Sequence, residues 1–336
     1  MTSMVSQFPT VVVGLLFVLA LVILSKSADK LIEKAVELSL HLGLSKVVIG
    51  ATVLSVGTTL PEVASSVAAA LGGNGQFGLG NAVGSMITNA SLVLGIGALG
   101  GIIPVKKGMQ QTFLFMSGLT LVFIGTSLVA GMGTGGGFFP RWSGIALLLL
   151  LPLYIWYTVK QKPDHLMDEI PEEKTEEESE KSKDSSLAAS LMILLFSSLG
   201  VTVGATLLVA TAETGAARLG IPDTVISSTI VAFGTSVPEV TTTLVAVRYG
   251  HGELAIGNVL GANMMNLLLV MGTTITLLPM GVAVPSSYYV IQFPVLIAIF
   301  ILLSIPVLTK RVEAINRLQG FLLLGLYVLY IVTNFI

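Results

Sequence analysis

Apolar residues dominate the chain in long runs that recur almost from end to end. Most runs have about 20 residues, the length of an α-helix that crosses the hydrocarbon core of a bilayer. None shows the apolar/polar alternation of an outer-membrane barrel strand. The pattern predicts an all-α polytopic membrane protein with ten transmembrane helices. We place the spans at residues roughly 9–26, 46–72, 79–101, 111–130, 142–160, 187–210, 224–248, 255–278, 287–308 and 315–334.

The composition also indicates a membrane-embedded chain. Its 336 residues are 53% hydrophobic and 11% charged, whereas a soluble domain carries about 25% charged residues. Cysteine is absent, which excludes disulfides and thiolate metal sites. No Lys or Arg precedes the first apolar run, so we interpret that run as a retained helix rather than a signal peptide.

Basic residues are distributed unequally between the connections. Of the 17 Lys and Arg residues, 15 lie in connections that follow odd-numbered spans. By the positive-inside rule, this predicts a multi-pass protein of the cell membrane with both termini outside. Residues 161–186 hold ten of the 19 acidic residues and no aromatic residue, so we expect a disordered cytoplasmic linker there.

The two halves of the sequence repeat at an offset of 177 residues. VIGATVLSVGTTLPEV (48–63) aligns with VISSTIVAFGTSVPEV (225–240), and GNAVGSMITN (80–89) aligns with GNVLGANMMN (257–266). Each half has five spans, so the second enters the membrane inverted, as in secondary transporters with midplane substrate sites. We therefore divide the chain into a five-helix repeat at 1–160, the linker at 161–186 and an inverted five-helix repeat at 187–336.

Two acidic residues, Glu62 and Glu239, lie in the middle of predicted spans and are equivalent in the repeat. An ionised side chain at the bilayer centre costs about 2.5–3.5 kcal/mol on insertion scales. No Lys, Arg or His lies at a comparable depth in any predicted span. A bound cation or a proton must therefore compensate the two carboxylates.

The residues around the two acids favour a cation. Gly57 and Pro61, and likewise Gly234 and Pro238, disfavour a continuous helix, so we expect an unwound turn with free carbonyls. Hydroxyl oxygens come from Thr58, Thr59, Thr235 and Ser236. An all-oxygen site suits hard ions such as Ca²⁺ or Na⁺. A kinked helix with a protonated acid is the structural alternative.

A polar stripe follows each acidic motif. Asn81, Ser85 and Asn89 fall at i, i+4 and i+8, on one face of a helix. The second half repeats the stripe with one gap, at Asn258, Ala262 and Asn266. Hydrogen bonds between helices account for buried asparagines as well as ion binding does, so both interpretations stay open.

With these motifs the sequence resembles the sodium/calcium exchangers of the cation/calcium antiporter superfamily. Their two alpha-repeats are similar to GTTLPE…GNAVGSMITN and GTSVPE…GNVLGANMMN. The resemblance implies exchange of Ca²⁺ for Na⁺ by alternating access, in which spans 1 and 6 slide across the other eight. The metal ligands it implies are Glu62, Glu239, Thr58, Thr235, Thr59, Ser236, Ser85, Asn89 and Asn266, with backbone carbonyls of Ser55 and Ala232.

Two positions depart from the family pattern. Asn266 stands where potassium-dependent relatives carry an aspartate, so we expect exchange that does not depend on potassium. Ala262 replaces a serine that is common in the family, which puts one sodium site and the coupling ratio in doubt. The calcium/proton branch of the superfamily usually has a glutamate soon after the Gly-Asn pair. Gly84 and Ser85 occupy that region here, which argues against membership of that branch.

Other functional classes are weaker alternatives. A Ca²⁺/H⁺ antiporter on the same fold is the nearest one, with Glu62 and Glu239 carrying protons. A channel would need an open pathway. The three histidines lie near span ends or in loops and no mid-membrane Ser–Lys dyad exists, so we expect no enzymatic activity and no cofactor. The predicted partners are small inorganic cations and the lipid bilayer, with no nucleic acid, and no protein partner is inferred.

Overall fold

The computed structural model describes residues 1–105, 107–132, 137–160, 187–220, 234, 236–309 and 314–334. Helices make up nearly all of this part of the chain, as the hydropathy pattern predicts. The predicted linker at 161–186 lies outside the described residues. Two predicted site residues, Ala232 and Thr235, lie outside them as well.

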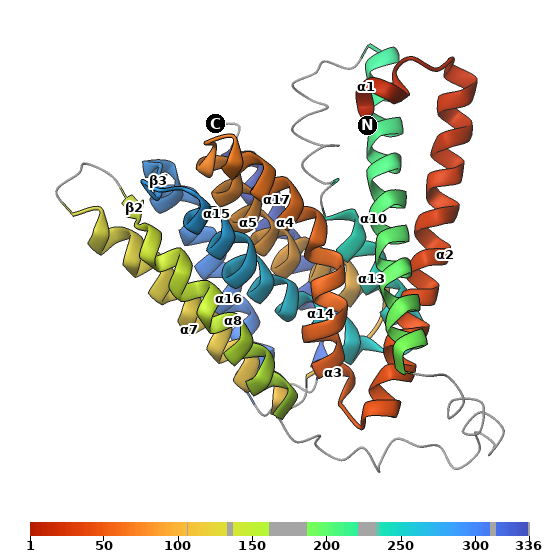
Figure 1. Ribbon diagram of the computed structural model, residues 1–336. Helices are drawn as coiled ribbons and strands as arrows, with labels where there is room; N and C mark the ends of the chain where they lie inside the picture. Colours follow the sequence, from red (N-terminus) through yellow and green to blue (C-terminus); the bar gives the residue numbers. More distant parts are fainter. Residues whose placement is uncertain are drawn as a thin grey trace.

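The first half contains three long helices, several broken ones and two short strands (Figure 1). Its elements are α1 (Thr2–Val5), α2 (Thr10–Leu42), α3 (Lys46–Ile49), the π-helical turn η1 (Gly50–Leu54), α4 (Ser55–Leu71), α5 (Gly75–Thr88), the π-helical turn η2 (Asn89–Val93), α6 (Leu94–Gly100), β1 (Ile103–Pro104), α7 (Lys107–Ala130), β2 (Gly137–Phe139) and α8 (Arg141–Lys160).

The second half follows a similar order. Its elements are α10 (Leu187–Arg218), α13 (Val237–Arg248), α14 (Gly252–Met265), the π-helical turn η4 (Asn266–Met271), α15 (Gly272–Leu277), β3 (Val282–Val284), the π-helical turn η5 (Tyr288–Gln292), α16 (Phe293–Leu308), β4 (Ala314–Ile315) and α17 (Arg317–Thr333).

Eight stretches of the described residues are long and apolar enough to cross a membrane. They are Thr10–Leu42, Lys46–Leu71, Gly75–Gly100, Met109–Ala130, Arg141–Lys160, Ala189–Arg218, Gly252–Leu277 and Tyr288–Leu308. The span predicted at 315–334 corresponds to the shorter apolar helix α17. The span predicted at 224–248 is described as a helix only from Val237, in α13.

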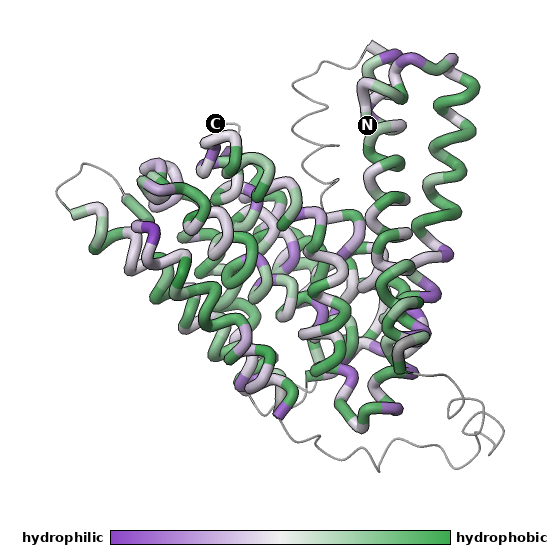
Figure 2. Tube along the Cα trace, viewed as in Figure 1, coloured by the Kyte–Doolittle hydropathy of each residue, from purple (hydrophilic) through white to green (hydrophobic). Residues whose placement is uncertain are grey.

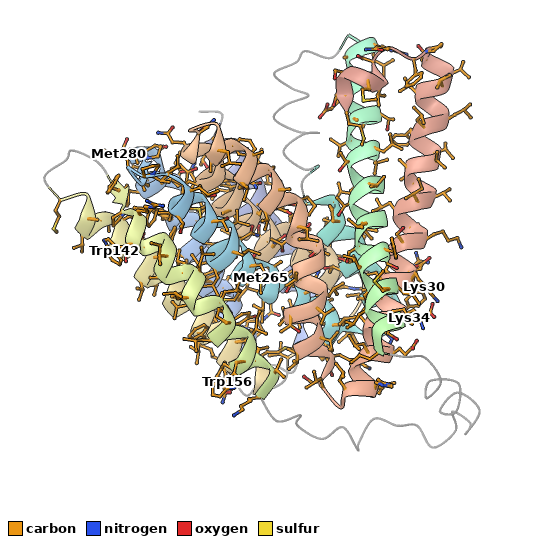
Figure 3. The ribbon with its side chains drawn as sticks, viewed as in Figure 1. Lys30, Lys34, Trp142, Trp156, Met265 and Met280 are labelled. Carbon is orange, nitrogen blue, oxygen red and sulfur yellow. The ribbon has the colours of Figure 1, made fainter. Side chains whose placement is uncertain are left out.

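Two predicted spans were too short, because hydropathy does not detect a polar extension of a helix. The sixth span, predicted at 187–210, continues to Arg218 in α10. The first span, predicted at 9–26, continues to Leu42 in α2. Its added turns carry the ion pairs Lys30–Glu33 and Lys34–Glu37, which support a solvated helix face. Figures 2 and 3 show this change along α2, from an apolar upper half to a hydrophilic region around Lys30 and Lys34. The helix ends at Gly43 in the left-handed conformation, with φ 64°.

Helices α2 and α10 form a tall pair at one side of the molecule (Figure 1). Glycines on α10 allow a close approach, since a Cβ at Gly200 would lie 2.9 Å from Ser27 Cβ and one at Gly204 would lie 2.7 Å from Leu24 N. Arg218, at the end of α10, donates a hydrogen bond of 2.9 Å to Thr10 Oγ1, at the start of α2. The two helices are therefore antiparallel.

Short strand pairs join connections of the two halves. Strand β1 pairs antiparallel with β4, with Ile103 opposite Ile315. Strand β2 pairs antiparallel with β3, with Phe138 opposite Ala283. The sequence analysis predicted no strands, because segments of two or three residues carry no alternation to detect. Since β1 follows α6 and β2 follows α7, the two pairs lie at opposite ends of the helical bundle.

The outer surface fits a lipid environment. Trp142 and Trp156 are both exposed and lie near opposite ends of α8 (Figure 3), as expected for aromatic residues at the two membrane–water interfaces. Lys160 lies over the Trp156 ring at 4.3 Å. The interior is formed mainly by α14 and η4, and Met265 at their junction is fully buried.

Candidate functional site

The first acidic motif lies on a helix that is not unwound. Helix α4 begins at Ser55 and runs through Pro61 to Leu71, so the unwound turn that we predicted around Gly57 and Pro61 is wrong. Proline removes one helical hydrogen bond, here the bond to the Gly57 carbonyl, and the other turns hold the helix together. The irregularity lies one turn earlier, in η1.

The second acidic motif occupies a helix start. Helix α13 begins at Val237, with Pro238 in its first positions and Glu239 in its first turn. Proline is pre-organised for such a position, and a carboxylate there interacts favourably with the positive end of the helix dipole. The sequence pattern Gly-Thr-Ser-Val-Pro-Glu therefore places Glu239 at an electrostatically favourable site.

The structure brings Glu62 and Glu239 together. They are 2% and 1% exposed, and Glu239 lies close enough to Glu62 for the two carboxylates to repel each other. Thr58 is within hydrogen-bonding reach of the Glu239 carboxylate. No ion pair among the described residues involves either carboxylate. Neither buried acid therefore has a protein cation beside it in this part of the chain.

Several buried polar atoms of the two acids and of other predicted ligands have no hydrogen-bond partner among the described residues. They are Glu62 Oε2, Glu239 Oε2, Thr59 Oγ1, Ser236 Oγ, and both amide atoms of Asn89 and Asn266. An unsatisfied buried polar group costs about 1–3 kcal/mol. Packing alone leaves this cost uncompensated for these groups. Their oxygens form a set that suits a dehydrated hard cation.

The asparagines of the two stripes play different roles. Asn81 donates hydrogen bonds to Ser66 Oγ at 2.9 Å and to the Glu62 carbonyl at 3.2 Å. Asn258 accepts one from Thr58 Oγ1 at 3.4 Å and donates one to Thr242 Oγ1 at 3.4 Å. These two residues therefore hold helices together, as the alternative interpretation of the stripe requires.

The last asparagine of each stripe behaves otherwise. Asn89 and Asn266 are each 1% exposed, and each is the first residue of a π-helical turn, η2 or η4. Their side-chain atoms have no partner among the described residues. π-Helical turns inside α-helices occur often at functional sites. The stripe thus contains a structural asparagine and an unbonded one in each half.

The remaining predicted residues of the first half are also buried. Ser55 is fully buried, its hydroxyl donates to the Thr52 carbonyl at 3.1 Å, and its own carbonyl accepts from Thr58 Oγ1 at 3.4 Å. Ser85 is 4% exposed. Ser55 also lies near the second half, because a Cβ at Gly261 of α14 would be 2.6 Å from Ser55 Oγ.

Sequence reasoning missed two candidate residues. Thr243 Oγ1 is buried without a partner in the described chain. Its repeat equivalent is Ser66, so a small hydroxyl one turn after each glutamate was a signal that could have been used. Asn263 is fully buried and donates to the Met86 carbonyl at 3.3 Å, while its Oδ1 has no partner among the described residues. Its repeat equivalent is Met86 itself, so the alignment gave no signal.

A cavity of about 330 Å³ reaches the site from one side. The buried Glu62 lines it together with Asn81, α10 forms one wall, and Glu213 and Thr2 line it near the end of α10. The described residues hold no cluster of three or more His, Cys, Asp or Glu side chains. The site therefore offers two carboxylates and neutral oxygens, a set suited to Ca²⁺ or Na⁺ rather than to zinc.

Comparison with known proteins identifies the family. The family described as sodium/calcium exchanger protein matches residues 12–160 and 189–336. The sodium/calcium exchanger MaX1 of Methanosarcina acetivorans is 32% identical over 96% of this chain and 98% of its own length. An uncharacterised membrane protein of Methanocaldococcus jannaschii, MJ0091, is 33% identical over 94% of this chain and 95% of its own.

Solved structures give the same result. A structure of the sodium-calcium exchanger NCX_Mj soaked with Na⁺ and Sr²⁺ superposes with a TM-score of 0.76 at 33% identity, covering 96% of this chain and 98% of that one. Another NCX_Mj structure, soaked with zero Na⁺ and Ca²⁺, has a TM-score of 0.77 at 32% identity and covers 97% and 99%. The chain, with its paired buried carboxylates, belongs to the sodium/calcium exchanger family.

Proposed function

We propose that this protein is a secondary antiporter that exchanges Ca²⁺ for Na⁺ across the membrane by alternating access. The observation that carries the proposal is the pair of buried carboxylates, Glu62 and Glu239, with no ion pair to a described basic residue. Together they present a charge of about −2, which one Ca²⁺ or two Na⁺ neutralise. The two ions thus compete for the same charge, and exchange follows.

The proposed ion ligands are the two carboxylates together with oxygen atoms of the other residues that the sequence predicted as ligands. Thr59, Ser236, Asn89 and Asn266 support the assignment, since their buried side chains have no partner in the described chain. Thr58, Ser55 and Ser85 are also buried. Thr235 and the Ala232 carbonyl complete the proposed set by repeat equivalence with Thr58 and Ser55.

The proposed architecture is two inverted five-helix repeats, at 1–160 and 187–336. Two structural features support it. The π-helical turns η2 and η4 begin at Asn89 and Asn266, which are 177 residues apart, the offset of the sequence repeat. The strand pairs β1–β4 and β3–β2 are equivalent to each other, because β1 and β3, and likewise β2 and β4, lie about one repeat offset apart in the sequence. An odd number of spans in each repeat inverts the second one.

We also propose that transport does not require potassium and that both termini face outward. Position 266 is a neutral asparagine, so the site lacks the additional carboxylate that potassium-dependent relatives have there. If more than two Na⁺ exchange for each Ca²⁺, each extra charge that crosses contributes about 2.3 kcal/mol per 100 mV. Transport would then respond to the membrane potential.

The test is calcium uptake into proteoliposomes driven by an outward sodium gradient. Glu62→Gln and Glu239→Gln each remove one of the two charges while keeping the side-chain size, so we expect each to abolish uptake. Glu33→Gln is the matched control, because Glu33 is an exposed acid of α2 paired with Lys30, and its uptake should equal that of the unaltered protein.

Ion replacement separates the remaining alternatives. Uptake by the unaltered protein should persist when potassium is replaced by choline, and it should stop when sodium is removed. Calcium uptake driven by a proton gradient in the absence of sodium would show that the protein is a Ca²⁺/H⁺ antiporter instead. Full uptake by Glu62→Gln or Glu239→Gln would refute the site.

A further inference from the structure

The cavity that reaches Glu62 has a second acidic residue at its other end. Thr202, Thr206 and Glu213 line it along one face of α10. From Thr202 to Glu213 the helix rises about 16 Å, at 1.5 Å per residue. Glu213 is half-buried and lies near the end of α10, whereas Glu62 is buried at the inner part of the cavity. The two carboxylates thus mark the entrance and the interior of one path.

Glu213 is held in place by a hydrogen bond from the N-terminal helix. Thr2 Oγ1, on the short helix α1, donates a hydrogen bond of 2.6 Å to Glu213 Oε2. The nearest basic residue in sequence, Arg218, binds elsewhere, with hydrogen bonds of 2.6 Å to the Phe8 carbonyl and 3.1 Å to the Ser6 carbonyl. The ion pairs of the described residues do not include Glu213.

We propose that Glu213 is an entrance carboxylate that draws hydrated cations into the cavity and passes them on toward Glu62. The inference rests on the proposed function of Glu62 and adds a residue outside the ion site. A cleft with one sign of charge and low-dielectric walls focuses the electric field and raises the local counter-ion concentration. Because Glu213 is partly exposed, the ion keeps most of its water there and is released easily.

Comparison of the two repeats shows that only one side of the membrane has such an entrance carboxylate on α2 or α10. The position equivalent to Glu213 is Val36 of α2, which carries no charge. The acidic neighbour of Val36, Glu37, is in an ion pair with Lys34. The entrance carboxylate therefore acts on ions that arrive from the side of the membrane on which α1 lies, and has no equivalent at the corresponding place in α2.

The experiment measures the apparent KM for Ca²⁺ in membrane vesicles of each orientation, with the full chain. For vesicles that expose α1 to the medium, we expect Glu213→Gln to raise KM about three- to tenfold at low ionic strength, with an unchanged maximal rate. Choline chloride at about 0.5 M shortens the Debye length to a few ångströms and should remove most of the difference. Glu213→Asp should restore the low KM. In vesicles of the opposite orientation, KM should not change.

Two controls separate charge from anchoring. Thr2→Val removes the hydrogen bond to Glu213 and keeps the carboxylate, so KM should stay within about twofold of the unaltered value if charge is what matters. Glu33→Gln removes an equal charge from an exposed place on α2 and should leave KM unchanged. A rise in KM for Thr2→Val equal to that of Glu213→Gln would overturn the proposal, as would a salt-independent rise.

The same data distinguish this inference from the proposed function. If the unaltered protein exchanges the two ions but Glu213→Gln has a normal KM on both sides, the entrance role is refuted and the function stands. If the unaltered protein shows no exchange at all, the proposed function fails, and the entrance role fails with it.

Discussion

At the scale of single residues, the site is defined by which buried polar groups are bonded. Asn81 and Asn258 have protein partners, while Asn89 and Asn266, two turns further along each helix, have none among the described residues. The sequence predicted both stripes, but not this division. The division depends on which hydroxyls the neighbouring helix presents, and spacing within one helix does not contain that information.

A pair of substitutions tests the division. Asn258→Leu removes the two hydrogen bonds that join Asn258 to Thr58 and Thr242, so we expect a loss of about 1–3 kcal/mol of stability with or without calcium. Asn266→Leu removes atoms that no described residue satisfies, so ion-free stability should be close to that of the unaltered protein, while the stabilisation that added Ca²⁺ provides through binding to the folded state should vanish. Thermal unfolding in detergent, with and without Ca²⁺, measures both effects. Equal losses in the ion-free state would contradict the assignment.

At the scale of helices and strands, close contact between the halves depends on glycine. A Cβ at Gly257 of α14 would lie 2.5 Å from the Val47 carbonyl oxygen, and one at Gly50 would lie 2.5 Å from the Leu254 carbonyl oxygen. Both contacts are with backbone, which cannot rotate away. The sequence showed glycines that allow such packing, but not which helix they meet.

We therefore expect Gly257→Ala to push α14 away from α3 and η1. Overpacking of this kind costs about 1–3 kcal/mol, and it should also lower the exchange rate, because α14 leads directly into η4 and Asn266. Gly118→Ala is the matched control, since a Cβ there meets nothing within 4 Å. Thermal unfolding and calcium uptake of both variants check this. Normal stability of Gly257→Ala would contradict the prediction, because it would show that α14 can move away from α3 and η1 without loss of stability.

The elements themselves were predicted to different degrees. Long apolar helices were found because a membrane imposes their length and composition. The continuity of α4 through Pro61 was missed, because a single lost hydrogen bond does not break a helix whose neighbouring turns are intact. The π-helical turns were missed as well, since a change of hydrogen-bonding register has no composition of its own.

At the scale of the whole molecule, α2 and α10 form a pair beside the remaining helices (Figure 1). The family resemblance implies that this pair slides to alternate access. Helix α10 contacts α2 along Gly200 and Gly204, and it contacts α4 at Gly57, where a Cβ would lie 3.0 Å from Ser198 Cβ. The sequence could not place the pair relative to the other helices.

Engineered disulfides test the sliding, and the chain has no native cysteine to interfere. Ser27→Cys with Gly200→Cys links α2 to α10, and Gly57→Cys with Ser198→Cys links α10 to α4. Both pairs start from similar Cβ separations, 2.9 and 3.0 Å, somewhat below the roughly 3.5–4.5 Å of a disulfide. Oxidation should stop exchange reversibly in the second pair and not in the first. For each double-cysteine variant, the measurement is the ratio of the transport rate after oxidation to the rate after reduction. Equal ratios in the two variants would contradict a sliding α2–α10 pair.

The strand pairs set a limit on how the molecule can move. Each one fastens a connection of one half to a connection of the other, and the two fastenings sit at opposite ends of the bundle. Separating the two halves would break the main-chain hydrogen bonds of both strand pairs. A shift of α2 with α10 along the neighbouring helices would break neither strand pair, because the strands belong to other connections. We therefore expect the least costly motion to be a shift of the α2–α10 pair along a core that the strand pairs hold together at both ends.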